Sequence, residues 1–330
     1  MFHSSLSLAV VVLLQCSSSF DVNYIRAIVP VASPKVNVDV PISIWTPATI
    51  EPDSTSLPPA TYEYEIDIRR IARLLLGVDL PAFSFFRSSR KIPSEALEAA
   101  RIEAPSNSPV IIFSHGYLGS DLDLHPLCFH LASKGAIVAA PIYPESLCGV
   151  YEVPSSREDL TRIMILDACL EYISKTESTS GRVGFIGHSL GTGISSSYSS
   201  KSDDHSPRCC IAGFRSAPIA GSKYLVIASE GDGVCSSEFI SDRVEEERSA
   251  GKKNIESIIL KEFNHIDFLS EETNSAMVKF LSPLLPIAKA LKIPLLDFDK
   301  FALNPRSKEC GLAIEDAVVN FFAKELNLLG

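Results

Sequence analysis

The stretch GRVGFIGHSLGTG, residues 181–193, decides how the rest of the chain is interpreted. An apolar run typical of a buried strand leads into residues that favour a helix, and Ser189 stands between Gly187 and Gly191 at the junction. Gly-x-Ser-x-Gly in a strand–turn–helix setting is typical of a nucleophile elbow, a strained turn that exposes a serine hydroxyl. Larger side chains at 187 and 191 would collide with the adjoining strand and helix. The alternative is an ordinary turn serine that caps the helix.

Strands and helices alternate around this turn from residue 109 onward. Continuous apolar runs, expected as strands buried on both faces, are PVIIFS (109–114), AIVAAPIY (136–143), RVGFIG (182–187), CCIAGF (209–214), KYLVIAS (223–229) and IESIIL (255–260). Helices are expected around 124–135, 157–175, 189–200 and 237–251, and after residue 271. The alternation predicts an α/β fold with a mostly parallel central sheet flanked by helices on both faces. No change of composition divides the series, so we expect residues 20–330 to form a single catalytic domain.

The segment before residue 109 has a different pattern. Residues 36–46 alternate apolar and polar, which predicts an antiparallel strand near a sheet edge. A loop rich in proline, serine and threonine is expected over 48–62. Residues 66–86 begin as an amphipathic helix and end in aromatic residues, and we weigh a helix packed on the core against a flap over a lipid-binding mouth.

The composition is that of a globular protein that does not bind nucleic acid. Of 330 residues, 46% are hydrophobic and 21% charged, enough apolar material for a sizeable core. Thirty basic and forty acidic residues give a net charge of −10, which argues against a nucleic-acid partner because such a partner requires a basic face. No stretch is long and apolar enough for a transmembrane helix.

The N-terminus has the pattern of a signal peptide over residues 1–19. LSLAVVVLL (6–14) has the length of a signal-peptide apolar region, and small residues follow it at 16–19. The alternative is a buried strand or helix. A cleaved signal peptide would send the chain into the secretory pathway or out of the cell. The cysteines show no metal-binding spacing, and in an oxidising compartment one or more pairs could form disulfides.

A serine hydroxyl needs a base and an orienting acid to become a nucleophile. Two histidines follow Ser189 in the sequence. His205 lies in a polar loop close to the serine, whereas His265 directly follows the strand expected at 255–260, where the base belongs. The sequence therefore predicts His265 as the base, with a simple loop histidine as the alternative.

The acid is expected on the turn after the strand 223–229. KYLVIASEGDGV offers Glu230 and Asp232 there, and we favour Asp232 because it stands between two glycines. Glu230 is the second candidate, and a structural turn aspartate is the alternative interpretation of Asp232. Asp203 and Asp204 precede a strand and are not favoured.

The oxyanion hole requires two backbone N–H groups. Leu190 supplies one, because it follows the nucleophile, and the turn FSHGYLG (113–119) supplies the other, most naturally from Tyr117. We expect His115 to brace this turn and His188 to be structural.

With these residues in place, the chain resembles an α/β-hydrolase of the platelet-activating factor acetylhydrolase family. The resemblance runs through PVIIFSHGYLGS, LCFHLASKGAIVAAPIY, GRVGFIGHSLGTG and ESIILKEFNHIDF, and extends more loosely over most of residues 36–282. It implies the α/β-hydrolase fold and removal of a short or oxidised sn-2 acyl group from a phospholipid, without metal or other cofactor. It also implies Ser189 as nucleophile, His265 as base, and the amides of Tyr117 and Leu190 as oxyanion hole.

One departure from that family affects the substrate more than the chemistry. The family usually places its acid after the strand that follows the nucleophile helix, where this chain has CCIAGFRSAPIAG (209–221) and no acidic residue. The acid is therefore expected one strand later, at Asp232, as in dienelactone hydrolases and bacterial polyester hydrolases. The chain also resembles chlorophyllases in one run. Alternatives are thus another carboxylesterase, or a binding protein of the same fold without activity.

The expected partner is a small-molecule or lipid ester. The apolar stretches LLLGVDLPAFSFF (74–86) and FLSPLLPIAKALKIPLL (280–296) suit peripheral contact with a lipid interface. A pair of core helices is the alternative for the second stretch.

Overall fold

The computed structural model describes residues 20–329 apart from 33–34, 36, 49–56, 82, 84–85, 100–103, 154–157, 177–178, 200–204, 216–217, 285, 287–289 and 291–305. The expected signal peptide, Asp203 and Asp204 lie outside the described residues, as does most of the segment 280–296. Among the helices of the described part, none combines the length and apolar character needed to cross a bilayer.

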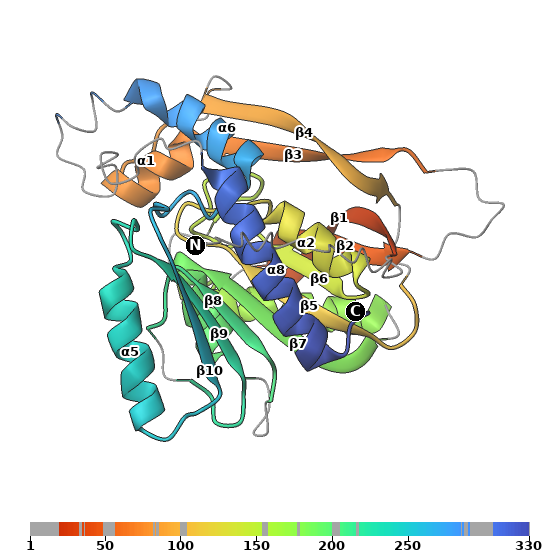
Figure 1. Cartoon of the computed structure of the whole chain (residues 1–330). Coiled ribbons are helices and arrows are strands. Elements are labelled where there is room, and N and C mark those ends of the chain that lie inside the picture. The colour runs from red at the N-terminus through yellow and green to blue at the C-terminus, as the bar shows by residue number, and fades with distance from the viewer. Residues whose placement is uncertain are drawn as a thin grey trace, which may run out of the picture.

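A single mixed sheet of ten strands forms the centre of the described structure (Figure 1). Its strand order is β10-β9-β8-β7-β5-β6-β2-β1-β4-β3. The strands are β1 (Asp21–Ala32), β2 (Asn37–Ala48), β3 (Pro59–Asp67), β4 (Arg87–Glu98), β5 (Ser108–Ser114), β6 (Ile137–Pro141), β7 (Thr179–His188), β8 (Arg208–Ile211), β9 (Tyr224–Ser229) and β10 (Ile255–Leu260). The run from β10 to β6 is parallel throughout, which confirms the predicted mostly parallel α/β sheet.

The inner parallel strands are buried on both faces because their residues pack into cores on opposite sides of the sheet, whereas β10, also expected to be buried, lies at the edge and is mostly exposed or half-buried. In β5, Ile111 and Phe113 belong to one apolar cluster, whereas Val110 and Ile112 belong to another on the opposite face. All seven residues of β5 are buried. This alternation explains why the strand appears in the sequence as a continuous apolar run rather than an alternating one.

Helices cover both faces of the sheet. They are α1 (Ile68–Leu76), α2 (His125–Ser133), α3 (Arg162–Thr176), α4 (Thr192–Ser197), α5 (Ser237–Ser249), α6 (Glu271–Leu281) and α8 (Ser307–Leu326). Residues of α2 and α8 join the first apolar cluster, and α8 crosses the front of the sheet in Figure 1. Residues of α3 pack into the second cluster, and those of α5 into a third. The helices expected from the sequence are therefore present, with shorter bounds.

The N-terminal part of the sheet differs from expectation. β2 is antiparallel as predicted, but it lies inside the sheet between β6 and β1 rather than near an edge. The antiparallel strands β3 and β4 form that edge of the sheet. The loop expected over 48–62 ends earlier than predicted, because β3 begins at Pro59. β4 was not predicted because its sequence, RSSRKIPSEALE, is mostly exposed and has no apolar run.

The segment 66–86 contains the expected helix in a short form. Asp67 caps α1 by accepting the N–H of Arg69, and Gly77 ends the helix with a left-handed φ of 67°. Ile71 and Ala72 are buried against the core, whereas Phe83 beyond the helix is exposed. The segment thus joins a packed helix to an exposed aromatic side chain.

Candidate active site

Ser189 occupies a strained turn between strand β7 and helix α4. Its φ is +52°, a left-handed value that side chains other than glycine rarely adopt. Added to Gly187, a Cβ would lie 2.5 Å from the carbonyl oxygen of Gly191. One added to Gly191 would lie 1.9 Å from the carbonyl oxygen of Ser114. The two glycines are therefore required sterically, as the sequence pattern predicted.

The structure brings Ser189, His265 and Asp232 into one hydrogen-bonded chain. His265 Nε2 lies 2.9 Å from Ser189 Oγ, and His265 Nδ1 lies 2.8 Å from Asp232 Oδ2. The side chain of Asp232 is fully buried, and that of His265 is 9% exposed. Glu230, the second candidate for the acid, is exposed. His205 is also exposed. Among the candidates that the structure describes, His265 bonds the serine and Asp232 bonds His265, whereas Glu230 and His205 do neither.

The loops after β9 and β10 are hydrogen-bonded to each other, which holds Asp232 and His265 in place. Ser229 Oγ, at the end of β9, accepts the N–H of Gly231 at 3.3 Å and that of Phe263 at 3.1 Å. Asp232 Oδ1 accepts the N–H groups of Val234 and Cys235, both at 2.8 Å. One carboxylate oxygen therefore fixes its own turn and leaves the other to face the imidazole.

The turn after β5 lies directly against the nucleophile. A Cβ on Gly116 would lie 3.1 Å from Ser189 Cβ, so a larger residue there would crowd the serine. Tyr117, the predicted second oxyanion donor, belongs to this turn, and Leu190 follows the serine in the other. The two turns predicted to carry the oxyanion donors therefore meet at Ser189.

His115 braces this turn from within. Its Nε2 accepts the N–H of Tyr143 at 2.9 Å, which leaves Nδ1 as the protonated nitrogen that donates to the Gly116 carbonyl at 2.8 Å. Burial lowers the pKa of His115 well below its ordinary value, with the charge of Arg162 adding to the effect. His115 is therefore neutral and structural in this geometry, in line with the expectation.

Arg162, at the start of α3, holds the same turn from outside. Its Nη1 donates to the carbonyl of His115 at 2.7 Å and its Nη2 to that of Gly116 at 3.3 Å. Glu145 accepts its Nε at 3.1 Å. The Gly116 carbonyl shares a planar peptide unit with the N–H of Tyr117, so donors to that oxygen also fix the direction of the N–H. This role of Arg162 is not predictable from the sequence, because Arg162 lies in an ordinary helical pattern far from any motif.

His188 is buried beside the base. Its ring centroid lies 5.0 Å from that of His265. Burial, together with the neighbouring His265, lowers the pKa of His188 to about 3. The ring is therefore neutral and packs as an apolar neighbour of the imidazole that faces Ser189.

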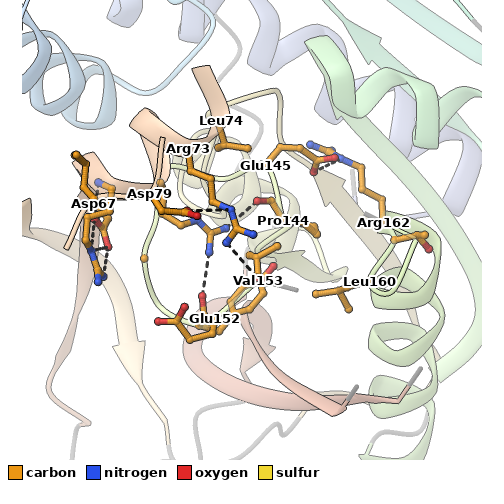
Figure 2. Close-up of a pocket in the computed structure, with 16 residues that line it drawn as sticks. Asp67, Arg73, Leu74, Asp79, Pro144, Glu145, Glu152, Val153, Leu160 and Arg162 are labelled. Atoms are coloured by element: carbon orange, nitrogen blue, oxygen red, sulfur yellow. Dashed lines mark hydrogen bonds and ion pairs between the residues drawn. The ribbon is translucent and has the colours of Figure 1, made fainter. Parts of the chain in front are cut away.

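A cavity of about 430 Å³ lies beside α1 and the loop around residues 144–153 (Figure 2). Arg162 and Leu74 line it, and the Leu74 carbonyl accepts the hydroxyl of Tyr117 at 2.8 Å. Acidic and basic side chains face one another across it. The guanidinium of Arg70 donates hydrogen bonds to three backbone carbonyls. Ser189 is not part of its lining, so the cavity adjoins the oxyanion turn without containing the nucleophile.

All seven cysteines of the described residues are free thiols, so none of the disulfides considered from the sequence is present there. Cys235 lies three residues after Asp232 and is half-buried. Sequence reasoning did not single it out, because its spacing from His265 is long and forms no recognised motif.

Known proteins share both a sequence segment and the fold. Residues 53–152 match the family of platelet-activating factor acetylhydrolase, isoform II. The matched segment includes the oxyanion turn and ends before Ser189. No curated protein sequence matches the chain significantly.

Solved structures extend the likeness to the whole fold. A ferulic acid esterase from Streptomyces cinnamoneus is 17% identical, with 93% of this chain and 90% of that chain covered and a TM-score of 0.53. An esterase from Pyrococcus furiosus is 14% identical, with 79% and 90% covered and a TM-score of 0.42. The fold comparison rests on the first of these. The chain therefore has an α/β-hydrolase fold and is similar, over residues 53–152, to the family of platelet-activating factor acetylhydrolase, isoform II.

Proposed function

We propose that the chain is a serine carboxylic ester hydrolase with Ser189 as nucleophile, His265 as base and Asp232 as the orienting acid. The observation that carries the proposal is the pair of hydrogen bonds on His265, 2.9 Å to Ser189 Oγ and 2.8 Å to Asp232 Oδ2. The match to an acetylhydrolase family adds support. A turn serine that merely caps a helix would not need a buried imidazole and a buried carboxylate in line behind it.

The reaction follows from this geometry in two halves. Ser189 Oγ attacks the ester carbonyl while His265 Nε2 takes its proton, and the same proton passes to the leaving alcohol. Water then attacks the acyl-serine with His265 again as base, which releases the acid. Asp232 remains ionised and stabilises the imidazolium that forms in each half.

The oxyanion is bound by the backbone N–H groups of Leu190 and Tyr117. In a tetrahedral intermediate the former carbonyl oxygen carries a full negative charge, and each positioned donor lowers the barrier by roughly 3 kcal/mol. Arg162 and His115 act through the Gly116–Tyr117 peptide and do not touch the substrate themselves. They are positioning residues in this proposal.

For the substrate, we propose a lipid-like ester, in particular a phospholipid with a short or oxidised sn-2 acyl group. The family match supports this choice. Exposed apolar side chains near the nucleophile also support it, since Leu190 is 44% exposed and Val234, beside the acid turn, is 38% exposed. We also propose peripheral contact with a lipid interface, and secretion directed by residues 1–19.

The serine is tested with a fluorophosphonate probe and with p-nitrophenyl acetate. Ser189→Ala should lose both labelling and turnover while the protein stays folded. Ser197→Ala is the matched control, because Ser197 is an exposed serine on helix α4, which follows the nucleophile, and bonds only the Gly193 carbonyl among the described contacts. A folded Ser189→Ala variant with full turnover would exclude the proposal, and an unlabelled wild type would favour a binding protein of this fold.

The acid is tested by a matched pair of substitutions. Asp232→Asn should lower kcat by about four orders of magnitude, because the imidazole loses the partner that holds its tautomer. Glu230→Gln should leave kcat unchanged, since Glu230 is exposed. The reverse ranking would move the acid to Glu230.

A substrate panel separates the lipid proposal from the alternatives. It contains acetylated and long-chain phospholipids, p-nitrophenyl acetate, a feruloyl ester and chlorophyll. Preference for the acetylated phospholipid, with binding to vesicles, is expected. Cleavage of soluble esters alone, without vesicle binding, would leave a carboxylesterase of another specificity.

A further inference from the structure

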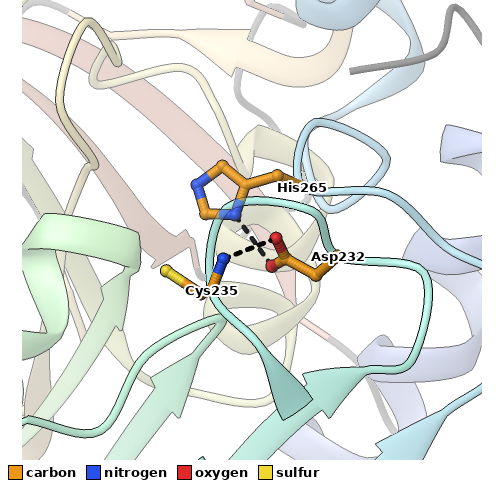
Figure 3. A group of neighbouring side chains, drawn as sticks. All are labelled: Asp232, Cys235 and His265. Carbon is orange, nitrogen blue, oxygen red and sulfur yellow. Dashed lines mark hydrogen bonds and ion pairs between the residues drawn. The ribbon is translucent and has the colours of Figure 1, made fainter. Parts of the chain in front are cut away.

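Three potential metal ligands converge beside the nucleophile. Asp232, Cys235 and His265 each offer one ligand atom, and these atoms all lie within 4.8 Å of one another. Figure 3 shows the thiol of Cys235 and the carboxylate of Asp232 on the same side of the imidazole. Two of the three belong to the proposed catalytic chain, whereas Cys235 has no part in it.

These three side chains form a ligand set that suits zinc. Thiolate sulfur, imidazole nitrogen and carboxylate oxygen are the ligands that zinc takes in proteins, at about 2.0–2.3 Å. Such bond lengths place tetrahedral ligands about 3.5 Å apart. The widest pair of ligand atoms, up to 4.8 Å apart, must therefore close by about 1.3 Å, and the hydrogen-bonded pair of His265 Nδ1 and Asp232 Oδ2, 2.8 Å apart, must open by about 0.7 Å, with a fourth position left for solvent.

We propose that Asp232, Cys235 and His265 bind a zinc ion that reversibly inhibits the hydrolase. The inference rests on the proposed function, because zinc inhibits by occupying the acid and the base. An imidazole bound to the metal cannot accept the serine proton, and a carboxylate bound to zinc no longer stabilises an imidazolium. The ion is an inhibitor here and takes no part in the ester cleavage.

The turn after β9 prepares this site. The N–H of Cys235 donates to Asp232 Oδ1 at 2.8 Å, which fixes the backbone of the third ligand relative to the first. Asp232 in turn bonds His265 at 2.8 Å. Cys235 is half-buried, so an ion can reach it from solvent.

Zinc binds cysteine as the thiolate, so the ion must displace the proton of the Cys235 thiol. Burial raises the pKa of Cys235 to about 11, with the nearby Asp232 carboxylate adding to the shift. The group is therefore a protonated thiol with little thiolate to react with oxidants. Zinc binding releases the thiol proton to solvent and forms a sulfur–zinc bond, with no change of oxidation state.

The test joins an activity measurement to one that does not depend on activity. Hydrolysis of p-nitrophenyl acetate is followed with increasing zinc and again after EDTA. Cobalt(II) is titrated as a spectroscopic substitute into wild type and into the Ser189→Ala variant, where a thiolate–cobalt charge-transfer band reports the bond to Cys235. The variants are Cys235→Ser and, as a matched control for adventitious histidine binding, His205→Ala.

We expect zinc to suppress the wild-type rate at least tenfold and EDTA to restore it. Cys235→Ser should require at least tenfold more zinc than wild type for the same fractional inhibition of its own rate, whereas His205→Ala should behave as wild type. The cobalt band should appear in wild type and in Ser189→Ala, and be absent from Cys235→Ser.

Two results would overturn the inference: no charge-transfer band in the folded wild type, or equal zinc sensitivity in wild type and Cys235→Ser. Since the band does not need turnover, an inactive wild type that shows it would contradict the proposed function and leave the metal site standing. Should Cys235→Ser fail to fold, the wild-type cobalt spectrum alone decides.

Discussion

Gly191→Ala tests whether the backbone corner at Ser189 determines the rate. The new Cβ would lie 1.9 Å from the Ser114 carbonyl oxygen and 2.8 Å from that of His115. Real Cβ contacts are essentially never under 3.0 Å, so the corner must retreat by at least 1.1 Å, the difference between 3.0 and 1.9 Å. Ser114 cannot give way easily, because β5 is paired with β7 at this point.

The expected loss follows from that displacement. Moving a reacting group by about 1 Å lowers the rate about 100-fold, which equals about 2.7 kcal/mol in the transition state. Overpacking of this kind also costs about 1–3 kcal/mol of folding stability. We therefore expect Gly191→Ala to stay folded at low temperature and to have a lower kcat at a similar KM.

The chain offers a matched control two residues away. A Cβ on Gly193 meets nothing within 4 Å, and Gly193 lies in helix α4. Gly193→Ala should keep full activity and gain up to about 1 kcal/mol from helix propensity. The assay is kcat and KM for p-nitrophenyl acetate, with a thermal melt of each variant. A folded Gly191→Ala variant with kcat within twofold of wild type would refute the steric reasoning.

Two further substitutions probe the oxyanion turn and a buried carboxyl. Arg162→Met should lower kcat about tenfold or more at similar KM, because the Gly116 carbonyl loses a donor; a change in KM alone would contradict this. Asp123 is fully buried, and burial raises its pKa from 3.8 to about 8. Its ionisation therefore favours the unfolded chain, and the cost grows as pH rises from about 4 to 8. Asp123→Asn should stabilise the fold by roughly 4 kcal/mol at pH 7 and by little at pH 4, measured by urea unfolding. An equal effect at both pH values would contradict the titration.

The parallel half of the sheet could be predicted from sequence because its strands are buried on both faces. Strands such as β5 and β6 then read as short, wholly apolar runs between helical segments. β4 could not be predicted, since only a few of its residues face the core. The prediction that β2 lies near an edge is wrong, because β1, β4 and β3 extend the sheet beyond it.

The side chains around Ser189 were predictable to the extent that they follow strands. Ser189, Asp232 and His265 each follow a strand of the parallel sheet, and the carboxyl ends of parallel strands meet at one edge of a sheet. Arg162 escaped prediction because tertiary packing, rather than a local motif, brings it to the site. Cys235 escaped prediction because it forms no recognised motif with Asp232 and His265.

The positive φ of Ser189 means that the residue this reaction needs is one that the backbone tolerates poorly. Glycine adopts the same angle without strain, whereas serine there costs on the order of 1–3 kcal/mol. Selection of this protein for heat resistance alone would therefore favour replacement of its own nucleophile. Directed evolution of this protein must therefore select for turnover as well as thermal stability, because selection for stability alone would enrich stable but inactive variants.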